Sequence, residues 1–264
     1  MEYKVWNWDT LQAELDAWRD AGQTATLWWR DDDAGQATEG LARLLEQSAA
    51  HDVPLTLATI PTEADEGTAR LVVDYPLVTV VQHGYAHTNH APKGAGAWEL
   101  GAHRPRATIL DELARGRARL DTLFGAQFLP VLAPPWSRID PGLVPDIGRA
   151  GLTGLSGFWP RRTIDGATAV AQVNAHVAVS DWKPEARFAG EENVIYDLLL
   201  HLWQRRHGEA DPAEPTGLLT HHQVHDEPTW AFLDRFFAFC AEHPAIEWVG
   251  APAAFADAER ANAA

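Results

Sequence analysis

Three consecutive aspartates, Asp31-Asp32-Asp33, come one residue after the apolar run Thr26–Trp29. Adjacent carboxylates repel one another, so a cation is expected close by, and a divalent metal ion is the simplest candidate. The alternative interpretation is a solvated acidic turn, because aspartate is common in turns. The residues that follow the other predicted strands have to distinguish between these two interpretations.

A pair of histidines, His83 and His87, follows the strand-like run 77–82 at a spacing of four residues. On a helical turn this spacing places both imidazoles on one face, where they can share a metal ion. Two histidines and one carboxylate leave coordination positions open for water, as in catalytic metal sites. Asn89 and His90 are further candidate ligands in the same loop. The pair is a weak signal in a chain with 12 histidines, but an acidic cluster after a neighbouring strand strengthens it.

Strand-like and helix-like segments alternate along the chain, which predicts a parallel sheet with crossover helices. The predicted strands are 25–29, 53–60, 77–82, 127–132, 152–155, 172–179, 216–220 and 246–249. The predicted helices are 9–21, 39–50, 66–73, 105–124, 141–150, 192–206 and 229–242, with a last helix in the alanine-rich tail. We predict one α/β domain over residues 1–264, a distorted (β/α) barrel with about seven parallel strands and outer helices.

Chemically capable residues follow several of the predicted strands. In barrels of this kind, catalytic residues lie at the carboxyl ends of the strands. The groups that do so here are Asp31–Asp33, His83 with His87, Pro134–Trp136, Asp181–Trp182, and His221 with His222 and His225. Their common placement predicts an active site at one rim of the barrel. The chain lacks a glycine-rich phosphate-binding turn of the GxGxxG or GxxxxGK[ST] pattern.

The composition argues against several classes of partner. The chain has 264 residues, with 37 acidic and 21 basic side chains and a net charge of −16, which disfavours nucleic acid and anionic membranes. Cys240 is the only cysteine, so neither an intrachain disulfide nor a thiolate zinc site is expected. No apparent signal segment or run of about 18 apolar residues occurs. We therefore expect a soluble, cytoplasmic protein without a membrane partner, and the sequence does not predict its oligomeric state.

The order of these groups resembles the polysaccharide deacetylase family, which has the NodB homology domain and is also described as carbohydrate esterase family 4. The family's paired aspartates match Asp32-Asp33, and its His-Ser/Thr-x-x-His motif matches 83–87, with glycine in place of the hydroxyl residue. Its proline-aromatic turn matches 133–136, but alanine stands where the family has an arginine. Its Asp-Trp pair matches 181–182, and its leucine two places before a catalytic histidine matches 219–221.

The resemblance implies a metal-dependent hydrolase that removes N-acetyl groups. By motif, Asp33, His83 and His87 would hold the divalent ion, with zinc favoured over cobalt, nickel or manganese. Asp32 would be the general base, and the backbone N–H of Trp136 would stabilise the oxyanion.

The same resemblance assigns the proton donor to the leaving amine. His221 would be the general acid, with His222 as the alternative because the motif fixes the position only to within one residue. Asp31 aligns with an apolar position of the family's motif and is therefore predicted to be peripheral. The missing arginine at Ala133 leaves Asp32 without its usual partner, and Arg30 or Arg138 would have to supply the charge. An ion pair between Arg30 and Asp31 is the alternative interpretation of Arg30.

Residues predicted to contact substrate are Arg30, Pro135, Asp181, Trp182 and His222. Tryptophans 28, 29, 136, 159 and 182 are candidates for stacking on sugar rings, although Trp28 and Trp29 alternate faces, so that at least one packs inside the protein. Glu99, Arg104 and Arg106 could bind polar groups or be solvated. His225 and Asp226 are interpreted as a helix cap, and His176 as a core or rim residue.

Two functions remain open from the sequence. The first is a metal-dependent hydrolase that acts on an N-acetylated sugar, glycan precursor or related small amide. The second is a catalytically silent carbohydrate-binding protein on the same barrel, which the glycine and alanine departures make conceivable. The retained aspartates and histidines favour the hydrolase.

Overall fold

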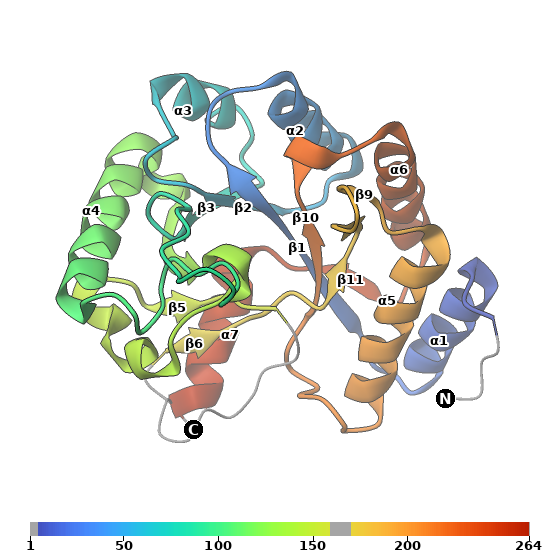
Figure 1. Cartoon of the computed structure of the whole chain (residues 1–264). Coiled ribbons are helices and arrows are strands. Elements are labelled where there is room, and N and C mark those ends of the chain that lie inside the picture. The colour runs from blue at the N-terminus through green and yellow to red at the C-terminus, as the bar shows by residue number, and fades with distance from the viewer. Residues whose placement is uncertain (1–4, 159–169, 264) are drawn as a thin grey trace.

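The computed structural model describes residues 5–158 and 170–263, and its centre is a curled parallel sheet (Figure 1). The strands follow one another across the sheet in the order β6-β5-β4-β3-β2-β1-β10-β7, and β11 pairs with the first residues of β1. Their bounds are β1 Ala25–Ala34, β2 Leu55–Thr59, β3 Val78–His83, β4 Phe128–Ala133, β5 Gly154–Leu155, β6 Ala171–Gln172, β7 Val177–Ala178, β10 Thr216–Thr220 and β11 Ile246–Trp248. The predicted barrel of parallel strands is confirmed.

The two ends of this strand order meet in one extended segment, which contains both β6 and β7. On one side Ala175 N donates to Gly157 O at 3.1 Å, beyond β5. On the other side His176 N donates to Gly217 O of β10 at 2.8 Å. The segment therefore acts as a single strand between β5 and β10. Counted in this way, the closed sheet has seven strand positions. This explains why the sequence shows one strand-like stretch, 172–179, where the structure has two short strands.

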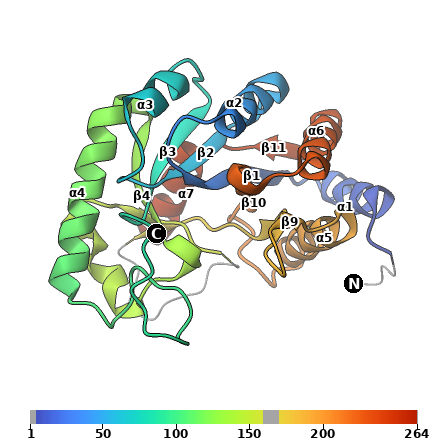
Figure 2. The same ribbon diagram turned by 45° about the horizontal axis from the view of Figure 1, so that its top comes forward.

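Helices surround the sheet on its outer side (Figures 1 and 2). They are α1 Trp8–Asp20, α2 Glu39–His51, α3 Glu66–Val72, α4 Arg106–Phe124, α5 Glu191–Arg206 and α6 Glu227–Glu242. The last helix, α7 Ala251–Ala263, packs instead against residues of the barrel interior. The predicted helix over 141–150 is a 3-10 helix, η3, which has Pro145 in its interior. In the described part of the chain, no helix has the length and apolar character needed to cross a membrane.

Strand β1 continues five residues further than predicted, so the three aspartates belong to the strand rather than to a turn after it. Trp28 faces the barrel interior, where its ring meets Phe255 of α7 at 6.4 Å. Trp29 faces outward, against Phe237 of α6 at 4.7 Å. Both tryptophans are fully buried, so neither is available for sugar stacking.

Beside the acids, the pairing of β1 with β2 shifts by one residue. Asp31 lies opposite Leu57, but Ala34 lies opposite Thr59, so β1 has one residue more than β2 in this interval. This is a β-bulge, which interrupts the alternation of side chains along a strand. Asp33 adopts a left-handed φ of 66° within it. As a result, two consecutive side chains, Asp32 and Asp33, line the same cavity.

Replacing Phe255 by alanine is expected to lower the free energy of unfolding by about 3–5 kcal/mol, because its ring fills the amino-terminal end of the barrel against Trp28. Denaturant unfolding followed by tryptophan fluorescence measures this change. The control is Val73→Ala, at a residue that is 63% exposed, where a change below about 0.5 kcal/mol is expected. Equal losses in the two variants would contradict the packing role of Phe255.

Candidate metal centre and active site

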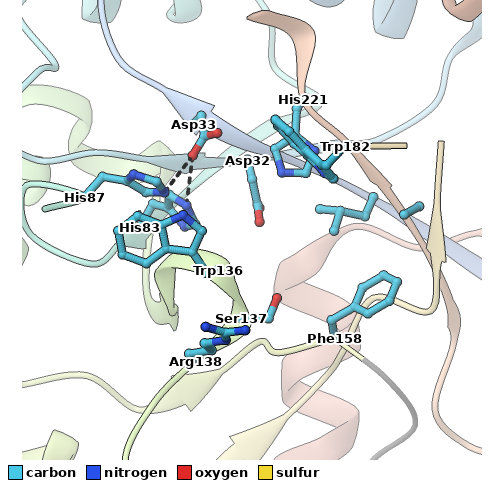
Figure 3. A pocket seen from close by; sticks show the side chains of 12 residues that line it. Asp32, Asp33, His83, His87, Trp136, Ser137, Arg138, Phe158, Trp182 and His221 are labelled. Atoms are coloured by element: carbon cyan, nitrogen blue, oxygen red, sulfur yellow. Dashed lines mark ion pairs between the residues drawn. The ribbon is translucent and has the colours of Figure 1, made fainter. Parts of the chain in front are cut away.

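A cavity of about 580 Å³ opens at the carboxyl ends of the barrel strands (Figure 3). Seven of the predicted site residues line it, namely Asp32, Asp33, His83, His87, Trp136, Trp182 and His221. Four others, Arg30, Pro135, Asp181 and His222, do not line it. Trp159, also predicted as a stacking residue, lies outside the described residues.

Three of the lining side chains form a set that fits a metal ion. Asp33 Oδ1 lies 3.1 Å from His83 Nε2 and 3.3 Å from His87 Nε2 (Figure 3). The ligand atoms lie within 4.8 Å of one another. The two histidines come together without the helical turn that their spacing would allow. His83 ends β3, and His87 lies in an irregular loop with a left-handed φ of 50°.

The hydrogen bonds of His83 decide which of its ring atoms is free. Its Nδ1 lies 2.9 Å from the carbonyl oxygen of Ala133, so Nδ1 donates. In the neutral ring Nε2 is then a lone-pair acceptor, as a metal-ligating imidazole requires. Asp33 Oδ1, which faces it, is buried without a hydrogen-bond donor. Two acceptors held this close need a shared proton or a metal ion between them.

The electrostatics of the site favour a cation. Burial alone would raise the pKa of Asp33, but the neighbouring imidazole of His83 outweighs it and holds that pKa well below its usual range. Burial opposes protonation of His83, yet Asp32 and Asp33 together raise its pKa. Asp33 is therefore ionised at neutral pH, and the negative charge is concentrated where the imidazole nitrogens converge.

Glu99 was expected to bind substrate or to be solvated, and the structure corrects this expectation. It is 1% exposed, and its carboxylate accepts hydrogen bonds from the backbone N–H groups of Tyr85, Ala86 and Thr88 at 3.1, 2.8 and 3.4 Å. It thus holds the loop between the two histidines. Gly84 makes room for it, because a Cβ there would lie 1.9 Å from Glu99 Oε2. The glycine that departs from the family motif is therefore required by this carboxylate.

Arg30 lies inside the barrel, fully buried beneath Asp32. Its Nε and Nη2 donate to the two carboxylate oxygens of Asp32 at 2.7 and 3.0 Å. Its Nη1 donates to the carbonyl oxygens of Ser156 and Gly157. The alternative prediction, an ion pair with Asp31, is wrong. Arg30 supplies a guanidinium to Asp32 although position 133 is alanine, as the sequence hypothesis proposed.

Arg138, the other candidate for that charge, lies at the rim of the cavity. It is exposed, donates to the carbonyl oxygen of Ala97 at 3.2 Å and faces the Trp98 ring at 5.7 Å. Asp32 is therefore held by Arg30. Arg138 instead lies where it can contact a molecule bound in the cavity.

The two neighbouring histidines after β10 point in different directions. His221 lines the cavity and meets the Trp182 ring edge-on at 4.8 Å (Figure 3). His222 is 3% exposed, and its Nδ1 lies 2.5 Å from Asp31 Oδ1. Only His221 is therefore placed to act on a molecule in the cavity, and the alternative of His222 as the acid is not supported by its position. Asp181 accepts from Arg187 at 2.9 Å in the β8–β9 hairpin (Ser180–Asp181 and Arg187–Phe188).

The proline-aromatic turn, η2 (Pro135–Ser137), borders the metal ligands. Trp136 has a left-handed φ of 55°, and its ring packs on His87 at 4.3 Å. Pro135 is buried and packs against Gly84. A Cβ added at position 84 would lie only 2.6 Å from Pro135 Cγ. Pro135 therefore shapes the histidine loop rather than contacting substrate.

The remaining candidates have structural partners. Arg104 pairs with Glu112 at 2.7 Å, and Arg106 pairs with Asp146 at 2.6 Å. Asn89 Oδ1 accepts from the N–H groups of Ala91 and Trp98. His90 is exposed and does not line the cavity. The expected helix cap at Asp226 is confirmed, since its carboxylate accepts from Thr229 N at 2.9 Å.

A second cluster, His176, His201 and Glu214, is buried away from the cavity. His176 Nδ1 accepts from Gly217 N at 2.9 Å, so Nε2 of the neutral ring carries the proton and cannot ligate. The two rings stack at 3.5 Å with an angle of 14°, so their in-plane nitrogens do not converge on one point. Burial, with the charges of His176 and Arg205, lowers the pKa of His201 to about 2. The hydrogen bond at His176 Nδ1 and the stacking of the two rings therefore favour a core cluster over a metal site.

Comparison with known proteins supports the fold of a carbohydrate esterase. No protein-family model and no curated sequence matches the chain. Among solved structures, it is similar to a family 4 acetyl xylan esterase from Clostridium thermocellum in complex with a cobalt ion, with a TM-score of 0.52, 15% identity, and coverage of 88% of this chain and 90% of the other. It is also similar to a peptidoglycan N-acetylglucosamine deacetylase, with a TM-score of 0.55, 14% identity, and coverage of 91% and 96%.

A third similar structure is a pseudoenzyme of the same esterase family from Bacillus anthracis. Its TM-score is 0.52 at 18% identity, and the alignment covers 84% of this chain and 63% of the other. The resemblance predicted from the motifs is thus confirmed as a likeness of fold to polysaccharide deacetylases. Because the fold occurs in both active and silent proteins, the activity has to be argued from the residues of this chain.

Replacing Glu99 by alanine is expected to weaken divalent-ion binding roughly 10–100-fold, because the loop that presents His87 loses the carboxylate that holds its N–H groups. Isothermal titration with Zn²⁺ and Co²⁺ measures the dissociation constants without relying on activity. Glu66→Ala is the control, since the Glu66 side chain is 85% exposed. Unchanged ion affinity in folded Glu99→Ala protein would show that the loop keeps its shape without this residue.

Proposed function

We propose that this protein is a metal-dependent hydrolase that removes an acetyl group from an N-acetylated sugar, glycan or related small amide. The observation that carries the proposal is the Asp33, His83 and His87 set, which shares one cavity with the carboxylate of Asp32 and the imidazole of His221. One divalent ion is expected, with zinc favoured and cobalt, nickel or manganese as alternatives. Bound there, it would supply Lewis-acid activation of water and of the acyl carbonyl.

Asp32 acts as the general base in this proposal. It takes a proton from the attacking water as the water oxygen bonds to the acyl carbon. Its bidentate contact with Arg30 holds both carboxylate oxygens in a defined orientation on the cavity floor. A planar guanidinium with further bonds to Ser156 and Gly157 is itself immobile, so the base is positioned before the substrate arrives.

His221 acts as the general acid. As the C–N bond breaks, its protonated imidazole gives a proton to the nitrogen of the leaving amine, so the products are acetate and a free amine. Trp182 packs edge-on against the ring and limits its movement. The backbone N–H of Trp136 is the proposed donor to the acyl oxygen as negative charge develops on it.

The walls of the cavity fit a neutral carbohydrate or small amide. Trp136, Trp182 and Phe158 provide aromatic surface around the polar centre, and about 580 Å³ lies within the range of small-molecule sites. Among the lining residues that the structure describes, Arg138 is the one arginine or lysine. Among the similar structures, two are an acetyl xylan esterase and an N-acetylglucosamine deacetylase, which is consistent with an acetylated carbohydrate substrate.

The first test combines metal analysis with an acetate-release assay. The purified protein should contain, or bind, about one divalent ion, and should release acetate from N-acetylglucosamine oligomers or simple acetamides. Asp32→Asn is expected to lower kcat about 10²–10⁴-fold, as loss of general-base catalysis does, while it keeps the metal. Metal binding without hydrolysis of any substrate would favour the alternative of a catalytically silent carbohydrate-binding protein. Absence of metal binding would refute the proposed site.

Removing the guanidinium beneath the base should also impair turnover. Arg30→Ala leaves the Asp32 carboxylate buried without a counter-charge, which is expected to destabilise the protein by about 3–5 kcal/mol and to lower kcat well beyond the loss of folded protein. Ser156→Ala removes only one partner of Arg30 and serves as the control. Circular dichroism establishes the folded fraction, and acetate release per folded molecule gives kcat. Normal turnover by folded Arg30→Ala protein would dismiss the role of Arg30.

A further inference from the structure

Asp31, the first of the three aspartates, is fully buried and accepts three hydrogen bonds. Thr220 Oγ1 donates to it at 2.6 Å, and the backbone N–H of His222 donates at 2.9 Å. The imidazole Nδ1 of His222 lies 2.5 Å from its other oxygen. A carboxylate without solvent needs this many donors, because an isolated buried charge is strongly disfavoured.

All three donors belong to the residues on either side of His221. In the parallel pairing of β1 and β10, Asp31 is the register partner of Thr220, the last residue of β10. The chain then makes a tight turn, η4 (His222–Val224), back towards α2. Asp31 therefore holds the chain immediately before and immediately after His221, on the outer side of the barrel.

Within the described ranges, 5–158 and 170–263, no carboxylate hydrogen-bonds the His221 ring, and its ring contact is with Trp182. Asp181, the neighbour of Trp182, accepts instead from Arg187 and from the N–H of Lys183. Apart from the contact with Trp182, the direction of the His221 side chain thus depends on its backbone. Asp31 binds Thr220 and His222, the residues on either side of His221, and so holds this backbone.

We propose that Asp31 is a positioning residue for the general acid, holding Thr220 and His222 so that His221 points into the cavity. This inference rests on the proposed function for the role of His221, but its structural part does not. An apolar residue, which the family motif has at this position, offers no acceptor to these donors. The effect of the Asp31–His222 pair should therefore appear at the proton-donation step.

The decisive comparison uses two leaving groups. An N-acetylated amine needs a proton to leave, whereas p-nitrophenolate, released from p-nitrophenyl acetate, does not. Asp31→Leu is expected to lower kcat for N-acetylglucosamine oligomers about 10²-fold and to change kcat for p-nitrophenyl acetate less than about threefold, with metal content unchanged. Asp31→Asn, which keeps acceptors for Thr220 and the His222 N–H, should recover most of the loss. Adding Asp31→Leu to His221→Ala should cause little further loss.

A merely structural role predicts a different pattern, in which Asp31→Leu lowers both rates and the metal content together. That result, or unchanged rates on both substrates, would overturn the inference while leaving the proposed function intact. His222→Ala provides a second variant should Asp31→Leu fail to fold. It leaves Asp31 its Thr220 partner and its main-chain partner, and the same selective loss is expected on a smaller scale.

Hydrogen exchange tests the structural part without activity. The amides of residues 221–224 are expected to exchange about tenfold faster in Asp31→Leu than in wild type, and near the wild-type rate in Asp31→Asn. Unchanged exchange in Asp31→Leu would overturn the inference. If the wild-type protein hydrolyses neither substrate, the proposed function fails, and this exchange measurement alone decides whether Asp31 fixes the turn.

Discussion

The site depends on one extra residue in β1, the bulge between Asp31 and Ala34. In a regular strand, consecutive side chains point to opposite faces, so Asp32 and Asp33 could not both line the cavity. Within the bulge Asp33 adopts a φ of 66°, and its side chain lines the cavity together with that of Asp32. The three adjacent carboxylates therefore have different neighbours, and a different partner offsets the negative charge of each one. Asp31 binds His222, Asp32 binds Arg30, and Asp33 faces His83 and His87.

Two departures from the deacetylase motifs are compensated by side chains from elsewhere in the chain. Alanine stands at position 133, where the motif has an arginine, and Arg30 reaches Asp32 from the same strand two residues earlier. Glycine stands at position 84, where the motif has a hydroxyl residue, and the carboxylate of Glu99 accepts from N–H groups of the histidine loop. In both cases the required charge or acceptor is present although its position in the sequence has changed. The departures therefore do not by themselves indicate a silent protein.

Much of the fold could be predicted because its periodicity is strong. The strand at 216–220 coincides with β10, and the predicted helices lie within a few residues of the observed ones. Seven of the predicted site residues line the cavity, since they follow strands that a barrel brings to one rim, whereas Arg30, Pro135, Asp181 and His222 do not line it. The bulge could not be predicted, because it arises from the register between β1 and β2. The contact between Asp31 and His222 was missed for a similar reason, since the two residues are 191 positions apart in the sequence.

The partners of the three acids also limit how many ions the site can hold. Asp32 is paired with a permanent cation, Arg30, through both of its oxygens, and Asp31 has donors on both of its oxygens. Only Asp33 retains a buried oxygen without a donor, directed at two imidazole nitrogens. A second ion would have to displace Arg30 or His222 from a buried pair, which leaves an uncompensated charge in the protein interior. The partners of the three acids therefore favour the binding of one ion from solution, at Asp33, which agrees with the base role proposed for Asp32.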